Sequence, residues 1–136
     1  MSDLKNAMGV AHSGLQAQSA RMRIISQNIA NADSVGTRPG ADPYQRQTIS
    51  FKNVMDKEMG VKKVVVDRYG NDPTPFPTIY QPGHPAADVD GYVKMPNLSP
   101  VIEQADLKEA QRAYEANLGV VDVSKRMLER TIDLLR

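Results

Sequence analysis

The sequence predicts a mainly α-helical protein, with long N- and C-terminal helices that pair as an antiparallel, coiled-coil-like domain and a small, proline-rich middle segment of β or extended structure. All nine prolines of the 136 residues lie between Pro39 and Pro100, so both ends lack the residue that most disrupts a helix. Apolar residues recur at helical spacing in the same two ends. We therefore expect three parts, formed by residues 1–34, 35–99 and 100–136.

The N-terminal segment carries two rows of mostly apolar residues in steps of seven, and the rows alternate at spacings of four and three. A pattern of this kind, sustained over about four heptads, is typical of a seam along which helices pack. Gly9 and Gly14 each lower the helix propensity by about 1 kcal/mol relative to alanine, so packing must stabilise the helix. Asn31 and Ser34 predict its end. The residues that we expect at this interface are Leu4, Met8, Ala11, Leu15, Met22, Ile25 and Ile29.

The C-terminal segment begins at Ser99-Pro100, a favourable N-cap followed by proline at the first helical position. Its apolar stripe is wider than a two-stranded seam requires, which predicts contact with more than one neighbour. The residues that we expect at this interface are Leu107, Tyr114, Leu118, Val121, Leu128, Ile132 and Leu135.

The middle segment contains short stretches rich in β-branched and aromatic residues, separated by prolines and glycines. Prolines at 73, 75 and 77 impose an extended connection within it. We therefore predict a small β element, whose strands lie near residues 48–51, 64–66, 78–80 and 92–95.

Composition excludes several classes of function. The formal net charge is +1 and the basic residues are scattered, which argues against a nucleic-acid-binding protein. The absence of cysteine excludes disulfides, thiolate metal sites and a cysteine nucleophile. No apolar run approaches the roughly 18 residues of a membrane-spanning helix, and the N-terminus lacks the features of a cleavable secretory signal. We expect either a cytoplasmic location or export by a route that removes no peptide.

Few residues suggest catalysis or metal binding. The two histidines, His12 in the N-terminal helix and His84 in a Pro-Gly turn, lie far apart in the sequence and lack the spacing of a zinc site. Residues 88–91 begin like a calcium loop, but the twelfth position holds Ser99 instead of glutamate, which favours a simple turn. We predict no catalysis, no cofactor and no bound metal. A metal-dependent hydrolase that uses His84 and Asp88 is the alternative enzyme.

From the residues alone, the chain is an interaction or assembly protein whose apolar helical stripes need partners. A coiled-coil adaptor or a type III secreted protein with helical ends fits the same pattern. Both an assembly protein and an adaptor or secreted protein remain open at this point.

Short motifs near the two ends of the chain resemble those of flagellar rod and hook proteins. Ser13-Gly14-Leu15-Gln-Ala followed by Asn28-Ile-Ala-Asn31-Ala resembles their N-terminal signature, and Tyr-Glu-Ala-Asn at 114–117 resembles their C-terminal one. The residues that carry this resemblance are Ser13, Gly14, Leu15, Asn28, Ala30, Asn31, Tyr114, Glu115 and Asn117.

The middle segment narrows the resemblance to one family among the rod and hook proteins. Residues 80–88, Tyr-Gln-Pro-Gly-His-Pro-Ala-Ala-Asp, and residues 90–97, Asp-Gly-Tyr-Val-Lys-Met-Pro-Asn, are similar to the family of proximal-rod proteins of the FlgC type. The stretch after Ala105 departs from this family, which usually carries more apolar, methionine-rich residues there. Another rod or hook subunit with the same end motifs is the alternative within this class.

The resemblance implies a structural subunit of the proximal rod, the hollow drive shaft that transmits motor torque and encloses the protein export channel. It implies that the terminal helices form the inner tube of a helical assembly and that the middle segment forms an outer layer. The implied partners are copies of the chain, other proximal and distal rod proteins, the rod–membrane-ring junction protein, the membrane ring and the flagellar type III export apparatus. The implied location is the periplasm-spanning rod of the basal body, reached by export without a cleaved signal peptide.

Overall fold

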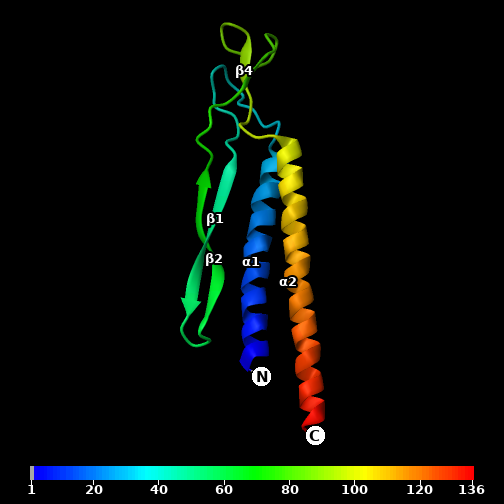
Figure 1. The fold of residues 1–136 in the computed structure, drawn as a ribbon. Coiled ribbons are helices and arrows are strands. Elements are labelled where there is room, and N and C mark those ends of the chain that lie inside the picture. Colours follow the sequence, from blue (N-terminus) through cyan, green and yellow to red (C-terminus); the bar gives the residue numbers. More distant parts are fainter. Residues whose placement is uncertain (1) are drawn as a thin grey trace. The chain divides into compact units, whose positions relative to one another are not determined.

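The computed structural model describes residues 2–136. These residues form two long helices and two small sheets (Figure 1). Strands β1 and β2 form one two-stranded sheet, and β3 and β4 form the other. Both predicted helices and all four predicted strands are present, so the mainly helical class with a small β region is confirmed. In chain order the elements are α1 (Ser2–Ala30), β1 (Gln47–Asp56), β2 (Val61–Asn71), β3 (Thr78–Tyr80), β4 (Tyr92–Lys94) and α2 (Pro100–Leu134).

Local sequence signals set the ends of both helices. The Asn31 side-chain amide donates a hydrogen bond of 2.8 Å to the carbonyl of Gln27, and the Ser34 hydroxyl donates to Asn31 Oδ1 at 3.0 Å. These bonds satisfy polar groups where α1 stops. The backbone N–H of Glu103 donates to the carbonyl of Ser99, which places Ser99 at the start of α2 as predicted.

The chain forms two compact units, each assembled from separate stretches of sequence. The first unit contains residues up to 22, residues 49–68 and residues 108–136. The second unit contains residues 23–48 and 69–107. Each unit therefore combines part of α1, part of α2 and part of the middle segment.

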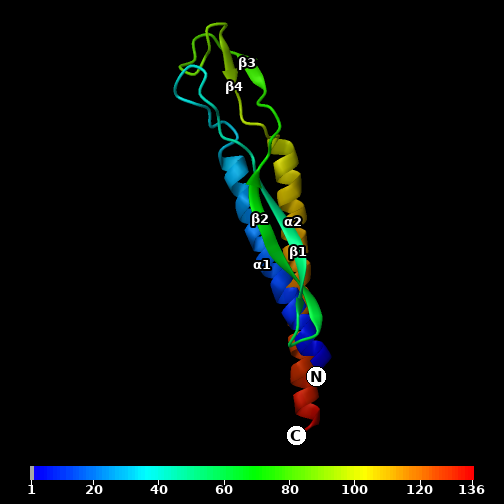
Figure 2. The same cartoon turned by 90° about the vertical axis from the view of Figure 1, so that its left-hand side faces the viewer.

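In the first unit, the tip of the β1–β2 hairpin lies along α1, and α2 lies on another side of α1 (Figure 1; Figure 2). Two glycines permit the close approach. A Cβ atom on Gly9 would lie 2.6 Å from Met59 Cε in the hairpin, and one on Gly14 would lie 2.7 Å from Asn117 Nδ2 in α2. The buried residues of this unit are correspondingly small and comprise Ala11, Ser13, Ala17, Ala110 and Ser124.

In the second unit, β3 and β4 pair antiparallel, with Ile79 opposite Val93 and Tyr80 opposite Tyr92. The two tyrosine rings meet edge to face with their centroids 5.3 Å apart. Gly91 precedes β4 with a φ of 87°, which an L side chain rarely adopts. A Cβ atom on this glycine would also lie 2.9 Å from the Tyr80 ring.

The turn predicted at residues 88–91 is confirmed. Asp88 Oδ1 accepts the backbone N–H groups of Asp90 and Tyr92, each at 2.9 Å. Both carboxylate contacts are local and close the turn before β4. No helix within residues 2–136 is long and apolar enough to cross a membrane.

Candidate assembly interface

The most buried positions of α2 form a column of small and polar residues in steps of seven. Glu103 is 1% exposed and Ala110 is 0% exposed. Sequence analysis missed this column because it counted only apolar residues. The column consists of Glu103, Ala110 and Ser124, which are buried, together with Asn117 and Thr131, which are half-buried.

The predicted apolar column of α2 alternates with this polar column and is half-buried at Leu107, Tyr114, Val121 and Leu128. The other three predicted residues of α2 are exposed, and Leu135 reaches 76% exposure. The chain therefore covers only one side of the wide apolar stripe on α2. The exposed large apolar side chains in residues 118–135 are Leu118, Val120, Val123, Met127, Ile132, Leu134 and Leu135, the last of which directly follows α2.

On α1, two of the predicted interface residues, Ala11 and Ile25, are buried. Leu4, Met8, Leu15, Met22 and Ile29 are half-buried. Additional buried positions on α1 lie outside the predicted rows. They include Ser13, Ala17 and Ile24, which lie four and seven residues apart and so share one face of the helix.

Ser13 and Gly14 of the N-terminal motif contact two different elements of the first unit. The Ser13 hydroxyl donates to the carbonyl of Val10 at 2.7 Å and accepts the backbone N–H of Val64 in β2 at 3.3 Å. The backbone of Gly14 instead lies against the side chain of Asn117 in α2. The N-terminal and C-terminal motifs therefore meet at Gly14 and Asn117.

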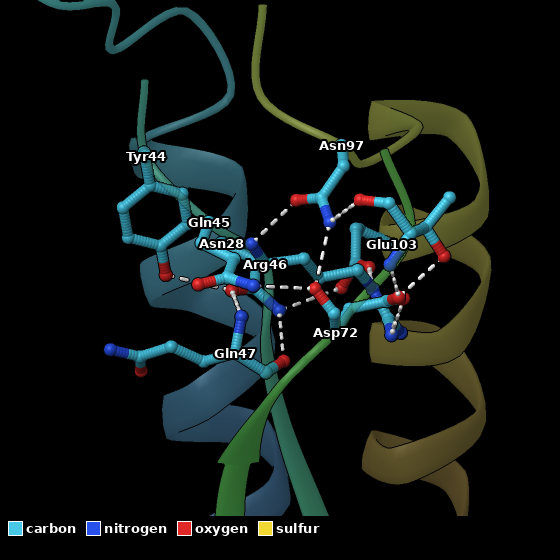
Figure 3. Close-up of polar contacts among 9 residues, drawn as sticks. Asn28, Tyr44, Gln45, Arg46, Gln47, Asp72, Asn97 and Glu103 are labelled. Carbon is cyan, nitrogen blue, oxygen red and sulfur yellow. Dashed lines mark hydrogen bonds and ion pairs between the residues drawn. The ribbon is translucent and has the colours of Figure 1, made fainter. Parts of the chain in front are cut away.

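Asn28 is the centre of a polar cluster in the second unit (Figure 3). Its amide nitrogen donates to the carbonyl of Gln47 at 2.9 Å and to Glu103 Oε2 at 3.4 Å. Its amide oxygen accepts the Tyr44 hydroxyl at 2.7 Å and the backbone N–H of Gln47 at 2.9 Å. Asn28 is 1% exposed, so these bonds replace all the hydrogen bonds that water would otherwise supply.

Arg46 extends the same cluster toward α2. Its Nε donates to the buried Glu103 carboxylate, and its Nη1 lies 3.3 Å from Asp72 Oδ2. Asn97 accepts the backbone N–H of Arg46 at 2.8 Å and donates to the carbonyls of Asp72 and Thr74. We call this set the polar clasp, and its members are Asn28, Tyr44, Arg46, Gln47, Asp72, Asn97 and Glu103.

Hydrogen bonds, burial and nearby charges within the polar clasp shift the pKa values of three residues. The hydrogen bond that Arg46 donates to the Glu103 carboxylate raises the pKa of Arg46. Hydrogen bonds from Thr74, and then the charge of Arg46, lower the pKa of Asp72. Burial, and then the charge of Glu103, raises the pKa of the Tyr44 hydroxyl. The clasp thus contains an ion pair in which a buried carboxylate has an oriented partner.

The remaining motif residues have less internal contact. Leu15 and Tyr114 are half-buried, and Asn31 closes the end of α1. Ala30 and Glu115 are exposed on the two helices.

Neither histidine belongs to a metal site in the part of the chain that the structure describes. His84 Nδ1 accepts the backbone N–H of Ala86 at 3.0 Å, while His12 is exposed on α1. Across residues 2–136, no three histidine, aspartate or glutamate side chains gather as metal ligands would.

Comparison with known proteins places these motifs in one family. A family model described as flagella basal body rod protein matches residues 8–37, and one described as flagellar basal body rod FlgEFG protein C-terminal matches residues 89–134. The flagellar basal-body rod protein FlgC of Agrobacterium fabrum is 49% identical over 136 residues, which cover 100% of this chain and 98% of that protein. The chain belongs to the FlgC family of flagellar basal-body rod proteins.

More distant members of the FlgC family are also similar over nearly their whole length. The Salmonella typhimurium protein of the same name is 37% identical over 131 residues, covering 96% of this chain and 97% of its own. The Aquifex aeolicus protein is 36% identical over 133 residues and 98% of each chain. Membership of this family makes the chain a structural subunit of the flagellar basal-body rod and not an enzyme, which decides against the hydrolase and adaptor alternatives.

Proposed function

We propose that this chain is a subunit of the proximal rod, where it helps to build the hollow shaft that transmits motor torque and encloses the export channel. The terminal segments, residues 1–34 and 100–136, form the inner layer of the shaft, and residues 35–99 form the outer layer. The observation that carries the proposal is the apolar face of α2 that the chain itself leaves exposed.

The two helices pair as an antiparallel, coiled-coil-like inner layer. In the first unit, Gly14 lies against Asn117, and Arg21 Nη2 lies 3.9 Å from Glu109 Oε2. In the second unit, Asn28 bonds to Glu103. From Gly14 to Asn28 the chain advances two heptads, and from Asn117 to Glu103 it goes back two heptads. This matched step supports a shared seven-residue repeat in helices of opposite direction.

A row of exposed apolar residues on α2, which we call the outer stripe, receives neighbouring rod subunits. The outer stripe consists of Val120, Val123, Met127 and Leu134, whose spacings of three, four and seven place them on one face. Burial of about 300 Å² of this surface would contribute roughly 7 kcal/mol before ordering costs are subtracted. In such a contact, the outer stripe of one subunit packs against a different face of the next subunit. Repeated contacts between unlike faces generate a helical tube and not a closed dimer.

The partners of the assembled subunit are further copies of the chain, the other proximal and distal rod proteins, the rod–membrane-ring junction protein and the membrane ring. The chain reaches them unfolded through the flagellar type III export apparatus, without a cleaved signal peptide. Two features support this route. The chain contains no cysteine that could form a disulfide before export. Its buried side chains are mostly small, so little packing has to be undone.

The test replaces Met127 or Val123 with aspartate in a motile strain. Each variant should be exported at the normal level but should fail to enter the basal body and should abolish swimming, because an unpaired carboxylate in a dry interface costs several kcal/mol. Gln111→Asp is the matched control, since it places the same residue at an exposed position of α2 that is polar already. Normal swimming by the Met127→Asp strain would refute the assigned face.

A further inference from the structure

The hairpin β1–β2 is a two-stranded sheet, and such a sheet has an open edge on each side. The part of β2 at Val64-Val65-Val66 is apolar, β-branched and without internal charge. An unpaired strand edge presents free backbone N–H and C=O groups, to which a strand of another chain can pair. A subunit that assembles beside many similar chains must prevent its strand edges from pairing with theirs.

Ser13 of α1 lies at the open edge of β2 in this structure. Its hydroxyl oxygen accepts the backbone N–H of Val64 at 3.3 Å, so that N–H points toward α1 and away from β1. The same hydroxyl donates to the carbonyl of Val10, which fixes the direction of its lone pairs. Ser13 is 6% exposed, so water does not compete freely for the Val64 N–H.

Further contacts hold the hairpin tip beside Ser13. Met59 sits where a Cβ atom on Gly9 would clash with it, one helical turn before Ser13. Asp56 accepts the N–H groups of Glu58 and Met59 and pairs with Lys63 at 2.6 Å, which fixes the turn that presents Met59. The edge of β2 is therefore held against α1 at the tip and at Val64.

We propose that Ser13 blocks the edge of β2. By accepting the Val64 N–H, it keeps the hairpin on its own α1 and prevents β2 from pairing with the strands of a second copy. Gly14, the next residue, meets α2 instead, so the two adjacent motif residues seat two different elements on α1. Rod subunits then join through their helices and not through their strand edges. This inference concerns the free subunit and does not depend on which face of α2 contacts a neighbour.

The test compares the purified full chain with its Ser13→Ala variant. Hydrogen–deuterium exchange of the Val64 amide should become about three- to tenfold faster in the variant, the range expected for loss of one hydrogen bond. Ser50→Ala is the matched control, because the Ser50 hydroxyl bonds to the carbonyl of Arg68 within the same hairpin and makes no contact with Ser13. Ser13→Thr retains the hydroxyl and should keep Val64 exchange near the level of the unmodified chain.

Self-association provides a second, independent measurement. The Ser13→Ala chain should form β-rich oligomers, detected by sedimentation and infrared spectroscopy, at concentrations where the unmodified chain does not. Adding Val64→Pro to Ser13→Ala should suppress these oligomers, since proline at an edge removes the free N–H group.

Three results would overturn the inference. Val64 could exchange in the Ser13→Ala variant no faster than in Ser50→Ala. The acceleration could extend equally to the amides of α2, which would mark Ser13 as a general stability residue and not an edge block. The oligomers could persist after Val64→Pro, which would place the association on another surface.

Discussion

At the scale of single residues, Asn28 has an unusual position, because one buried amide serves three separate parts of the second unit. It bonds to Tyr44 before β1, to Gln47 at the first position of β1 and to Glu103 in α2. Removing it leaves the half-buried backbone N–H and C=O groups of Gln47 without these partners. A buried group left in this state costs about 1–3 kcal/mol, more than the net value of the bond itself.

Asn28→Ala should therefore lower the free energy of unfolding by about 1–3 kcal/mol in urea denaturation. Asn28→Asp should cost more at neutral pH, because it places a second carboxylate beside that of Glu103. Asn31→Ala is the control, since the Asn31 side chain bonds at the exposed end of α1 and its loss should cost less than about 1 kcal/mol. Equal effects of Asn28→Ala and Asn31→Ala would show that the clasp has no special role.

The acid sensitivity of the fold also follows from single residues. Hydrogen bonds from Thr74 lower the pKa of Asp72, and those from Lys63 and Met59 lower the pKa of Asp56, both from an ordinary value of 3.8. A carboxyl group with a lowered native pKa stabilises the fold above its ordinary pKa. That contribution is lost as the pH falls through the lower native value.

The free energy of unfolding should therefore be steady near neutral pH and should decrease once the pH falls below about 4. Urea denaturation over this range measures the decrease. Asp72→Asn removes one of the two carboxyl groups with a lowered pKa and should make the decrease shallower. If the decrease kept its full slope in this variant, the pKa shift of Asp72 would contribute nothing to stability.

At the scale of elements, α2 has two faces with different tasks. Its buried column of small and polar residues permits close packing within the chain, while the outer stripe stays exposed. A small residue in such a column allows the neighbouring elements to approach α2 closely. A larger side chain would force the neighbouring elements apart, at a typical cost of about 1–3 kcal/mol.

Ala110→Leu should accordingly destabilise the chain by about 1–3 kcal/mol and lower its thermal midpoint. Ala116→Leu makes the same chemical change at an exposed position of the same helix and should leave the stability within about 0.5 kcal/mol. Thermal unfolding followed by circular dichroism distinguishes the two variants. A stable Ala110→Leu protein would mean that Ala110 is buried without being closely packed.

The elements themselves could be predicted from sequence because local signals set their limits. Ser99-Pro100 begins α2, Asn31 ends α1, and proline confines the strands to the middle. The buried column of α2 could not be found in this way, because apolar periodicity does not register Glu103 or Ser124. The polar clasp was also missed, since Asn28 and Glu103 are 75 residues apart and nothing local links them. The interface residues assigned from the helical rows stay predictions.

At the scale of the whole molecule, the distribution of apolar surface is that of an incomplete assembly. The large apolar side chains buried within the described residues are few, among them Ile24, Ile25 and Val93, whereas many on α2 are exposed. Apolar burial is the main favourable term in folding, and the entropy cost of ordering a long helix grows with its length. A free subunit therefore gains too little from its own contacts to hold both helices fully ordered.

We therefore expect the isolated subunit to keep its buried helical parts folded, to leave the exposed C-terminal part of α2 frayed, and to gain helix when neighbouring rod proteins are added. Circular dichroism of the mixture, compared with the sum of its separate components, measures the gain. Leu15→Asp and Leu128→Asp, each in a half-buried row of one helix, should reduce both the gain and rod incorporation while export persists. Gln111→Asp should leave both unchanged. An isolated subunit that is already fully helical, with one cooperative transition that rod proteins do not shift, would show that folding and assembly are separate events.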